Sequence, residues 1–323
     1  MPVERLPISL IIDDGSPINQ AYYLQPQQRS EFLIPNRFTH QYADLCNAYD
    51  IRGKFTVMPA PSSLGRIDVG LNRVPLPHLK EFLAIVRRKI APTHDITPEI
   101  LTHQQALRLP EFTPSHLYED EWVARASVKE MVPYFSLALQ ILKNVGLPAN
   151  GFTSPWNTGI TNEKRYAQAI GLAQWRVHRR AFTWYFLHVL SKVRGRWPSL
   201  TWKNKNVTVV MVPANTTDYF WNTQKAVSRA ASRRIAREGV DLYLSKDGKH
   251  GRLVELISQR VPLVFLTHWQ SLFANGRHTG LAGLEQLFER IRTRLGDRVE
   301  WMTCSDIARL SMRRGFAQRG GKP

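Results

Sequence analysis

Short apolar runs alternate along the chain with longer stretches of helical spacing, which is typical of a mostly parallel α/β fold. The predicted strands end at turn residues or at polar side chains, and they cover residues 8–12, 54–58, 150–153, 207–212, 261–267 and 299–302. The predicted helices carry apolar residues three and four positions apart, and they cover residues 36–49, 79–90, 128–145, 161–170 and 281–295. A last short helix is predicted with Ser305 as its cap.

The domain organisation follows from length and from the distribution of these elements. A chain of 323 residues is long enough for one large α/β unit or for two ordinary domains. No linker divides it, so residues 1–323 are predicted to form a single domain. Residues 176–206 are dense in Arg, Lys and Trp and are predicted to be an insertion between core elements. Residues 313–323 are predicted to be a short basic tail.

Composition narrows the classes of protein that the chain can belong to. Hydrophobic residues make up 43% and charged residues 22%, which excludes wholesale disorder. The 44 Lys and Arg residues exceed the 26 Asp and Glu residues, giving a net charge of +18 that favours contact with polyanions. No helix-turn-helix, zinc finger or RNA-binding motif accompanies this charge, so a nucleic acid is not the expected partner.

The location of the protein is predicted from what the sequence lacks. No run approaches the length of apolar sequence that a transmembrane helix needs. The N-terminus has neither the basic region nor the long apolar stretch of a signal peptide, so a cytoplasmic location is expected. Cys46 and Cys304 are too few for a disulfide framework and are predicted to be buried free thiols.

Polar groups able to do chemistry follow three of the predicted strands. Asp13 and Asp14 follow the first strand, and His268 follows the strand at 261–267. Pro155 and Trp156 follow the strand at 150–153. In parallel α/β folds, residues at the carboxyl ends of strands gather at one site. One aspartate could hold a divalent metal while the other accepts a proton from water, although Asp-Asp-Gly is also a common turn.

A second set of metal ligands is predicted in the segment 95–103. Glu99 and His103 are four residues apart, so on a helical turn they would share a face and reach one metal. A carboxylate and an imidazole suit Zn, Mn, Fe, Co or Ni. An ordinary helical Glu–His pair is the alternative. His268 could act as a general acid or be a structural histidine. Trp156 and Trp269 could stack on sugar rings or pack in the core.

The order of these motifs resembles the polysaccharide deacetylase family, also called NodB-homology or carbohydrate esterase family 4. The matching blocks span residues 8 to 269, most of the chain. Asp13-Asp14-Gly15 resembles the first block of the family, and the strand at 54–58 resembles the second. The segment 95–103 resembles the block that carries the metal-binding histidines. The blocks around Thr153-Ser154-Pro155-Trp156 and around His268 resemble the last two.

The resemblance implies a function and a set of roles. It implies an irregular (β/α) barrel of about seven strands that hydrolyses an N-acetyl or other amide group on a carbohydrate. Asp13 would be the general base, Asp14 and His103 metal ligands, and His268 the acid that protonates the leaving nitrogen. Two positions depart from the family: Glu99 stands in place of the first metal histidine, and Thr153 in place of the arginine that orients the catalytic aspartate. The metal set would then be Asp14, Glu99 and His103.

The expected substrate is a carbohydrate, anionic ones included because of the excess positive charge. Its binding residues are predicted to be Pro155, Trp156, Trp221 and Trp269, with Trp221 aligned loosely to an Asp/Trp block of the family together with Asp218. Three alternatives remain open from the sequence. They are a glycoside hydrolase and a non-sugar amidohydrolase on the same fold, and a non-catalytic protein that binds anionic polymers. The oligomeric state is not indicated.

Overall fold

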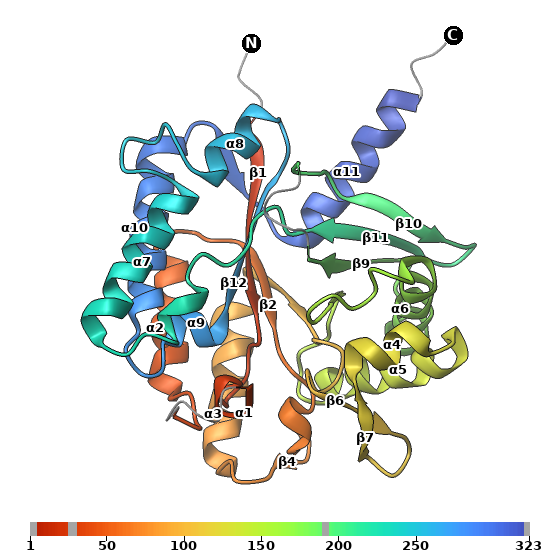
Figure 1. Cartoon of the computed structure of the whole chain (residues 1–323). Coiled ribbons are helices and arrows are strands. Elements are labelled where there is room, and N and C mark those ends of the chain that lie inside the picture. Colours follow the sequence, from red (N-terminus) through yellow and green to blue (C-terminus); the bar gives the residue numbers. More distant parts are fainter. Residues whose placement is uncertain (1–4, 25–30, 189–193, 320–323) are drawn as a thin grey trace.

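The protein is a mixed α/β structure in which helices lie outside two sheets (Figure 1). The computed structural model describes residues 5–24, 31–188 and 194–319. The sequence-based expectation of an α/β fold with parallel strands is confirmed at this level. None of the described helices is long and apolar enough to cross a lipid bilayer.

The first sheet places the N-terminal strand at its centre. Its order is β12-β1-β2-β5, all parallel, and β13 pairs with the beginning of β1. The strands are β1 (Leu6–Asp13), β2 (Gly53–Thr56), β5 (His94–Thr97), β12 (Leu263–His268) and β13 (Val299–Trp301). Asp13 lies opposite His268 in the register of β1 and β12, so the two residues reach the same edge of the sheet.

The second sheet contains two strands that the sequence pattern did not predict, at residues 182–187 and 199–203. Its order is β10-β11-β9-β8, parallel except for β10. The strands are β8 (Gly151–Thr153), β9 (Phe182–Leu187), β10 (Ser199–Lys203) and β11 (Thr208–Pro213). The prediction that residues 176–206 form an insertion is therefore wrong, because β9 pairs with both β8 and β11 inside the sheet.

Backbone contacts connect the two sheets on both sides. Just beyond β5, Glu99 forms a parallel bridge with Thr153 at the end of β8. Just beyond β11, the Asn215 N–H donates to the carbonyl oxygen of Val264 in β12 at 2.8 Å. The strands of the first sheet and of the second sheet are thereby held beside each other at both margins.

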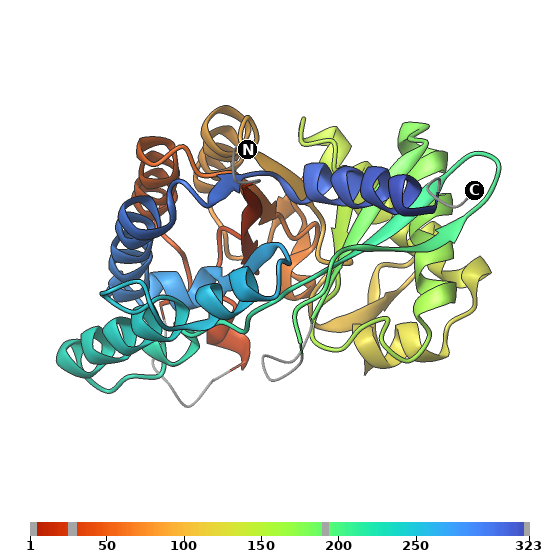
Figure 2. The same cartoon turned by 90° about the horizontal axis from the view of Figure 1, so that it is seen from above.

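Side chains from the two sheets pack against each other and against the beginning of α11. The cluster takes alternate residues of the strands: Ile11, Trp184, Phe186, Val210, Val212, Val264, Leu266, Cys304, Ile307 and Ala308. Successive strand residues point to opposite faces, so the next residues of these series point into the same interior. Those residues are Asp13, His188 and His268. Seen from above, α11 lies across the strands while the other helices lie outside them (Figure 2).

Six of the helices, α2, α3, α5, α6, α10 and α11, overlap the predicted ones, and α1, α4, α7, α8 and α9 are additional. Their bounds are α1 (Ala21–Leu24), α2 (Asn36–Ala48), α3 (Leu76–Ile85), α4 (Glu119–Arg125), α5 (Val128–Asn144), α6 (Glu163–His178), α7 (Arg229–Tyr243), α8 (Arg252–Ser258), α9 (Trp269–Phe273), α10 (Thr279–Leu295) and α11 (Cys304–Arg319). Helix α5 begins with a capping box, in which Ser127 and Glu130 each accept the other's backbone N–H.

Shorter elements complete the description. A π-helical turn (Val86–Ile90) follows α3, and 3₁₀ turns cover Pro61–Ser63 and Trp221–Thr223. Two small antiparallel hairpins pair β3 (Gly65–Arg66) with β4 (Gly70–Leu71), and β6 (Gln105–Arg108) with β7 (Thr113–Tyr118).

The last helix differs from its prediction at both ends. Thr303, and not Ser305, caps α11, because the Thr303 hydroxyl accepts the Asp306 N–H at 3.2 Å. The helix is long and includes Arg313 and Arg314, so the first part of the predicted basic tail is helical. Residues 320–323 lie outside the described residues. Both cysteines are free and buried, as predicted.

Asp95 connects β5 to the beginning of α11 through a buried carboxylate. It accepts hydrogen bonds from the Asn150 amide at 2.6 Å, from the Ser305 N–H at 2.6 Å and from the Ser305 hydroxyl at 2.9 Å. Burial raises the pKa of Asp95 to about 6, although these hydrogen bonds act in the opposite direction.

We expect Asp95 to make the free energy of unfolding fall as the pH rises from about 4 to about 6. The folded chain holds the Asp95 proton more tightly than the unfolded chain does, so this stabilisation is lost as the pH passes through the folded pKa. Asp95→Asn should remove a pH-dependent component of up to about 3 kcal/mol. Urea unfolding at several pH values measures it, with the exposed Asp297→Asn as control. Identical pH dependence in wild type and Asp95→Asn would contradict the expectation.

Candidate functional site

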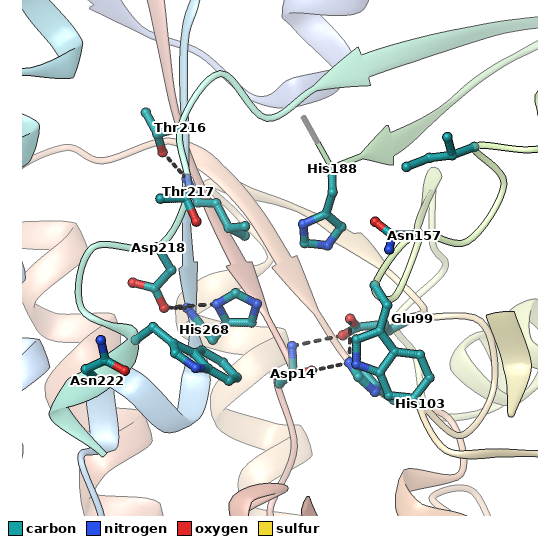
Figure 3. Close-up of a pocket in the computed structure, with 14 residues that line it drawn as sticks. Asp14, Glu99, His103, Asn157, His188, Thr216, Thr217, Asp218, Asn222 and His268 are labelled. Atoms are coloured by element: carbon teal, nitrogen blue, oxygen red, sulfur yellow. Dashed lines mark hydrogen bonds and ion pairs between the residues drawn. The ribbon is translucent and has the colours of Figure 1, made fainter. Parts of the chain in front are cut away.

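The carboxyl ends of the strands open into a cavity of about 950 Å³. Its walls come from both sheets and from the segment between β11 and α7, and Figure 3 shows the side chains that line it. They are Asp14, Glu99, His103, Trp156, Asn157, Ile160, His188, Thr216, Thr217, Asp218, Trp221, Asn222, Leu266 and His268. All the predicted metal ligands and the predicted acid therefore line one cavity.

Asp14, Glu99 and His103 form a compact buried group at one side of this cavity. One ligand atom of each lies within 4.8 Å of the other two. His103 Nε2 is 2.9 Å from Asp14 Oδ1 and 3.3 Å from Glu99 Oε1. Glu99 Oε2 also accepts the Asp14 N–H at 2.9 Å (Figure 3). The second oxygen of Asp14, Oδ2, accepts a hydrogen bond from Gln270.

The protonation of this group shows how strongly its members interact. Burial alone would raise the pKa of Asp14, but the charge of His103 and its hydrogen bond outweigh burial and lower it. Burial and the charge of Asp14 raise the pKa of Glu99. Burial would lower the pKa of His103, but the charges of Asp14 and Glu99 raise it well above its ordinary value. The two carboxylates thus stabilise a positive charge on His103.

These residues fit a divalent metal ion. Asp14 Oδ1 is buried, and beyond its ion pair with His103 Nε2 it has no hydrogen-bond partner among the described residues. Two carboxylates and one imidazole form a mixed oxygen and nitrogen ligand set that suits Zn, Mn, Fe, Co or Ni. A cation bound there would satisfy the free oxygen and neutralise the excess negative charge.

The local structure that joins Glu99 to His103 is a loop, not the predicted helical turn. Pro98 follows β5, and both Ile100 and His103 have positive φ angles, of 45° and 57°. The carboxylate of Glu119 stabilises this loop from the beginning of α4. It accepts the backbone N–H groups of Leu101, Thr102 and His103 at 3.1, 2.9 and 2.9 Å. The conformation of the loop, rather than helical spacing, brings the two ligands together.

The aspartate before Asp14 lies deeper in the protein. The Lys54 ammonium group, also fully buried, forms an ion pair with Asp13 Oδ1. The same ammonium donates to the hydroxyl groups of Thr56 at 2.9 Å and Thr153 at 2.7 Å. Lys54 thus contacts Asp13 from β2, whereas the family resemblance places an arginine at the position of Thr153. Lys54 stands at the beginning of a predicted strand, and the sequence pattern did not indicate that it would form an ion pair with Asp13.

His268 lies on the other side of the cavity and is held by Asp218. His268 Nδ1 is 2.9 Å from Asp218 Oδ2, which also accepts the Ser271 hydroxyl at 2.7 Å. Burial works against a charged imidazole, but the hydrogen bond and charge of Asp218 outweigh it and raise the pKa of His268 to about 9. His268 is therefore protonated at neutral pH and can donate a proton into the cavity.

The predicted aromatic contacts fall into two groups. Trp156 lines the cavity and packs edge-on against His103, with ring centres 4.6 Å apart. Trp221 lines it beside His268, at 4.7 Å. Trp269 is fully buried and packs against Phe38, and neither Trp269 nor Pro155 is among the residues that line the cavity. The expectation that these two bind substrate is not supported, because the turn after β12 points Trp269 into the core.

His188 is a cavity residue that the sequence analysis missed. It follows β9 directly, and its ring stacks on that of His268 with centres 6.4 Å apart. Alternation along β9 could have indicated it, since Trp184 and Phe186 point into the interior and His188 continues the series. The signal was hidden because residues 176–206 were interpreted as an insertion.

Comparisons with family models, with curated proteins and with solved structures found no match to this chain. The resemblance to polysaccharide deacetylases therefore depends on the motifs and on the site that they form.

Replacing Glu119 should weaken metal binding without touching a ligand. In Glu119→Ala three buried N–H groups of the loop lose their acceptor, so His103 should lose its fixed position. We expect the affinity for zinc, measured by calorimetry, to fall about 10–100-fold, as is typical when groups behind metal ligands are removed. Asp120→Asn changes the next carboxylate of α4 and serves as the control. Equal zinc affinity in Glu119→Ala and wild type would show that the loop keeps its shape unaided.

Proposed function

We propose that this protein is a metal-dependent hydrolase that cleaves an amide bond, such as the N-acetyl group of a carbohydrate. The observation that carries the proposal is the buried Asp14–Glu99–His103 group facing a protonated histidine, His268, across one cavity. The ligands come from segments 85 residues apart in the sequence, yet their atoms converge. The motif order that resembles the deacetylase family is consistent with this assignment.

The proposal includes the irregular (β/α) barrel that the resemblance implies. Seven strands, β1, β2, β5, β8, β9, β11 and β12, are paired or joined at their margins by the Glu99–Thr153 bridge and the Asn215–Val264 hydrogen bond. Helices outside the strands and an interior cluster between the sheets are consistent with such a barrel.

A divalent cation held by Asp14, Glu99 and His103 would supply Lewis acidity for the substrate carbonyl and a lowered pKa for water. The chain itself would supply the proton for the departing nitrogen. His268 is protonated at neutral pH, and Asp218 fixes its ring from behind. Trp156 and Trp221 line the cavity beside His103 and His268, where aromatic side chains are suitable for contact with sugar rings.

The cavity favours an uncharged group at the reaction centre. Among the described residues that line it there is no lysine or arginine, whereas Asn157, Asn222, Thr216 and Thr217 offer neutral hydrogen-bonding groups. The positive net charge therefore lies elsewhere on the protein. An anionic polymer could still bind outside the cavity, which retains the non-catalytic binding role as the alternative.

A glycoside hydrolase is less well supported. Such enzymes need two carboxylic groups on opposite sides of the scissile bond. Here Asp14 and Glu99 belong to the same compact group, and Asp13 is paired with Lys54 below the cavity wall. Asp218 lies on the other side of the cavity, but its carboxylate is held by His268 and by the Ser271 hydroxyl. The arrangement therefore resembles a metal site facing a histidine more than a pair of free carboxylic acids.

Removing one ligand should abolish both metal binding and activity. In Asp14→Asn the ligand set loses a charge and a strong donor, so zinc affinity and zinc-dependent release of acetate from an N-acetylated chitooligosaccharide should both fall at least 100-fold. Calorimetry and an acetate assay measure the two. His250→Gln, an exposed histidine far along the chain, is the matched control. Full acetate release by Asp14→Asn would overturn the proposed function.

Removing the charge behind His268 should shift the pH dependence of turnover. His268 donates a proton, so kcat for amide hydrolysis should fall as the pH rises through about 9, where its pKa lies in the wild type. In Asp218→Asn the negative charge that raises this pKa is gone, so the alkaline fall should move down toward the ordinary pKa of about 6.5. An unchanged alkaline limb in the pH–rate profile would exclude His268 as the acid.

A further inference from the structure

His188 occupies the space between the two halves of the site. In Figure 3 its ring points toward His268 on one side and toward the group of Asp14, Glu99 and His103 on the other. Its side chain is 24% exposed, and no described residue forms a hydrogen bond with it. A polar ring that lines a cavity and forms no hydrogen bond with a described residue can bind a substrate or a water molecule.

Asp13 lies directly behind His188 and is shielded from the cavity. Its side chain has 0% exposure and does not line the cavity wall. Lys54 pairs with Oδ1, while Oδ2 is buried without a hydrogen-bond partner among the described residues. That oxygen is 3.7 Å from His188 Nε2. The free lone pairs of Asp13 therefore face the histidine, and water in the cavity meets the imidazole first.

We propose that His188, with Asp13 behind it, is the base that takes the proton from the attacking water. The inference depends on the proposed function and changes one assignment within it. Asp13, expected from the family resemblance to be the base, becomes a positioning residue that orients Nε2–H of His188. Nδ1 of the same ring is then left as the proton acceptor.

The protonation states of the two stacked histidines support this division of roles. Burial lowers the pKa of His188 to about 4, although the charge of Asp13 acts in the opposite direction. His188 is therefore neutral at neutral pH and can accept a proton, whereas His268 is protonated and can donate one. Two titratable groups with pKa values displaced in opposite directions are typical of an acid and base pair.

The proton balance of the step is complete within these residues. The water oxygen forms a bond to the acyl carbon while one O–H bond breaks, and that proton moves to Nδ1 of His188. The bond from the acyl carbon to nitrogen then breaks, and the nitrogen receives the proton of His268. His188 releases its proton and His268 regains one from solvent. Each acyl bond consumes one water molecule, with no oxidant or reductant.

An ester substrate tests the role of the proposed base, His188, independently of the proposed acid, His268. With p-nitrophenyl acetate the leaving phenolate departs without needing a proton, so the rate depends mainly on how water is activated. The zinc-loaded wild type should hydrolyse it. His188→Gln keeps a polar side chain of similar size but has no basic nitrogen, so kcat should fall about 100-fold or more. Zinc affinity should stay within about two-fold of wild type, because His188 is not a ligand. His250→Gln is again the matched control.

A second variant separates a chemical role from a structural one. His188→Ala removes the ring. Imidazole added to the buffer should raise the rate of this variant at least about ten-fold, after subtraction of the hydrolysis that imidazole causes without the protein, because free imidazole can occupy the gap and accept the proton. A merely structural histidine would not be rescued in this way. This measurement also serves if His188→Gln folds poorly.

The possible outcomes distinguish the two proposals. If the wild type neither binds zinc nor hydrolyses the ester, the proposed function fails and this inference fails with it. If the wild type does both while His188→Gln and His188→Ala remain fully active, His188 is not the base and only this inference is overturned. Loss of activity in His188→Ala without rescue by imidazole also overturns it.

Discussion

The ion pair between Lys54 and Asp13 is the interaction on which the site depends. Two opposite charges are buried with no exposure, which is tolerated only because each has a partner and the remaining donors of the ammonium reach Thr56 and Thr153. These contacts join β1, β2 and β8, and hence both sheets. They orient Asp13 toward the interior. The chain turns after it, and Asp14, with a φ of 62°, lies beside Glu99 and His103 in the candidate metal site. Gly15 permits that turn, since a Cβ there would lie 1.9 Å from the Thr56 carbonyl oxygen.

Sequence reasoning predicted the parts of the molecule that depend on local pattern. Apolar runs predicted β1, β11 and β12, and helical spacing predicted α2, α5 and α10. Polar residues after strands predicted Asp14 and His268, because parallel strands bring their carboxyl ends together. Glu99 and His103 were also predicted as partners, but through a helical turn that does not exist. Their spacing was compatible with a loop that only the distant Glu119 carboxylate stabilises.

The positions of Lys54, His188 and Trp269 could not be predicted in this way. They depend on which strands pair in the folded protein, and a single segment of the sequence does not show that. Lys54 begins an apolar run, where a lysine ordinarily faces solvent, and only the sheet order shows that it meets Asp13. Basic residues flank β9, and for that reason its segment was not predicted to be a core strand. His188, which follows β9, was therefore missed as well. Trp269 follows His268 in sequence, yet it points into the core because adjacent residues diverge where a strand becomes a helix.

The bridge between Glu99 and Thr153 has a consequence for folding. Glu99 belongs both to the candidate metal site and to the seam where the two sheets meet. A cation that binds the folded chain but not the separated sheets would draw the equilibrium toward the closed seam. Binding of the cation and association of the two sheets would then be thermodynamically linked, so that each favours the other. Removal of a cation bound at this site would then also weaken the contact between the two sheets.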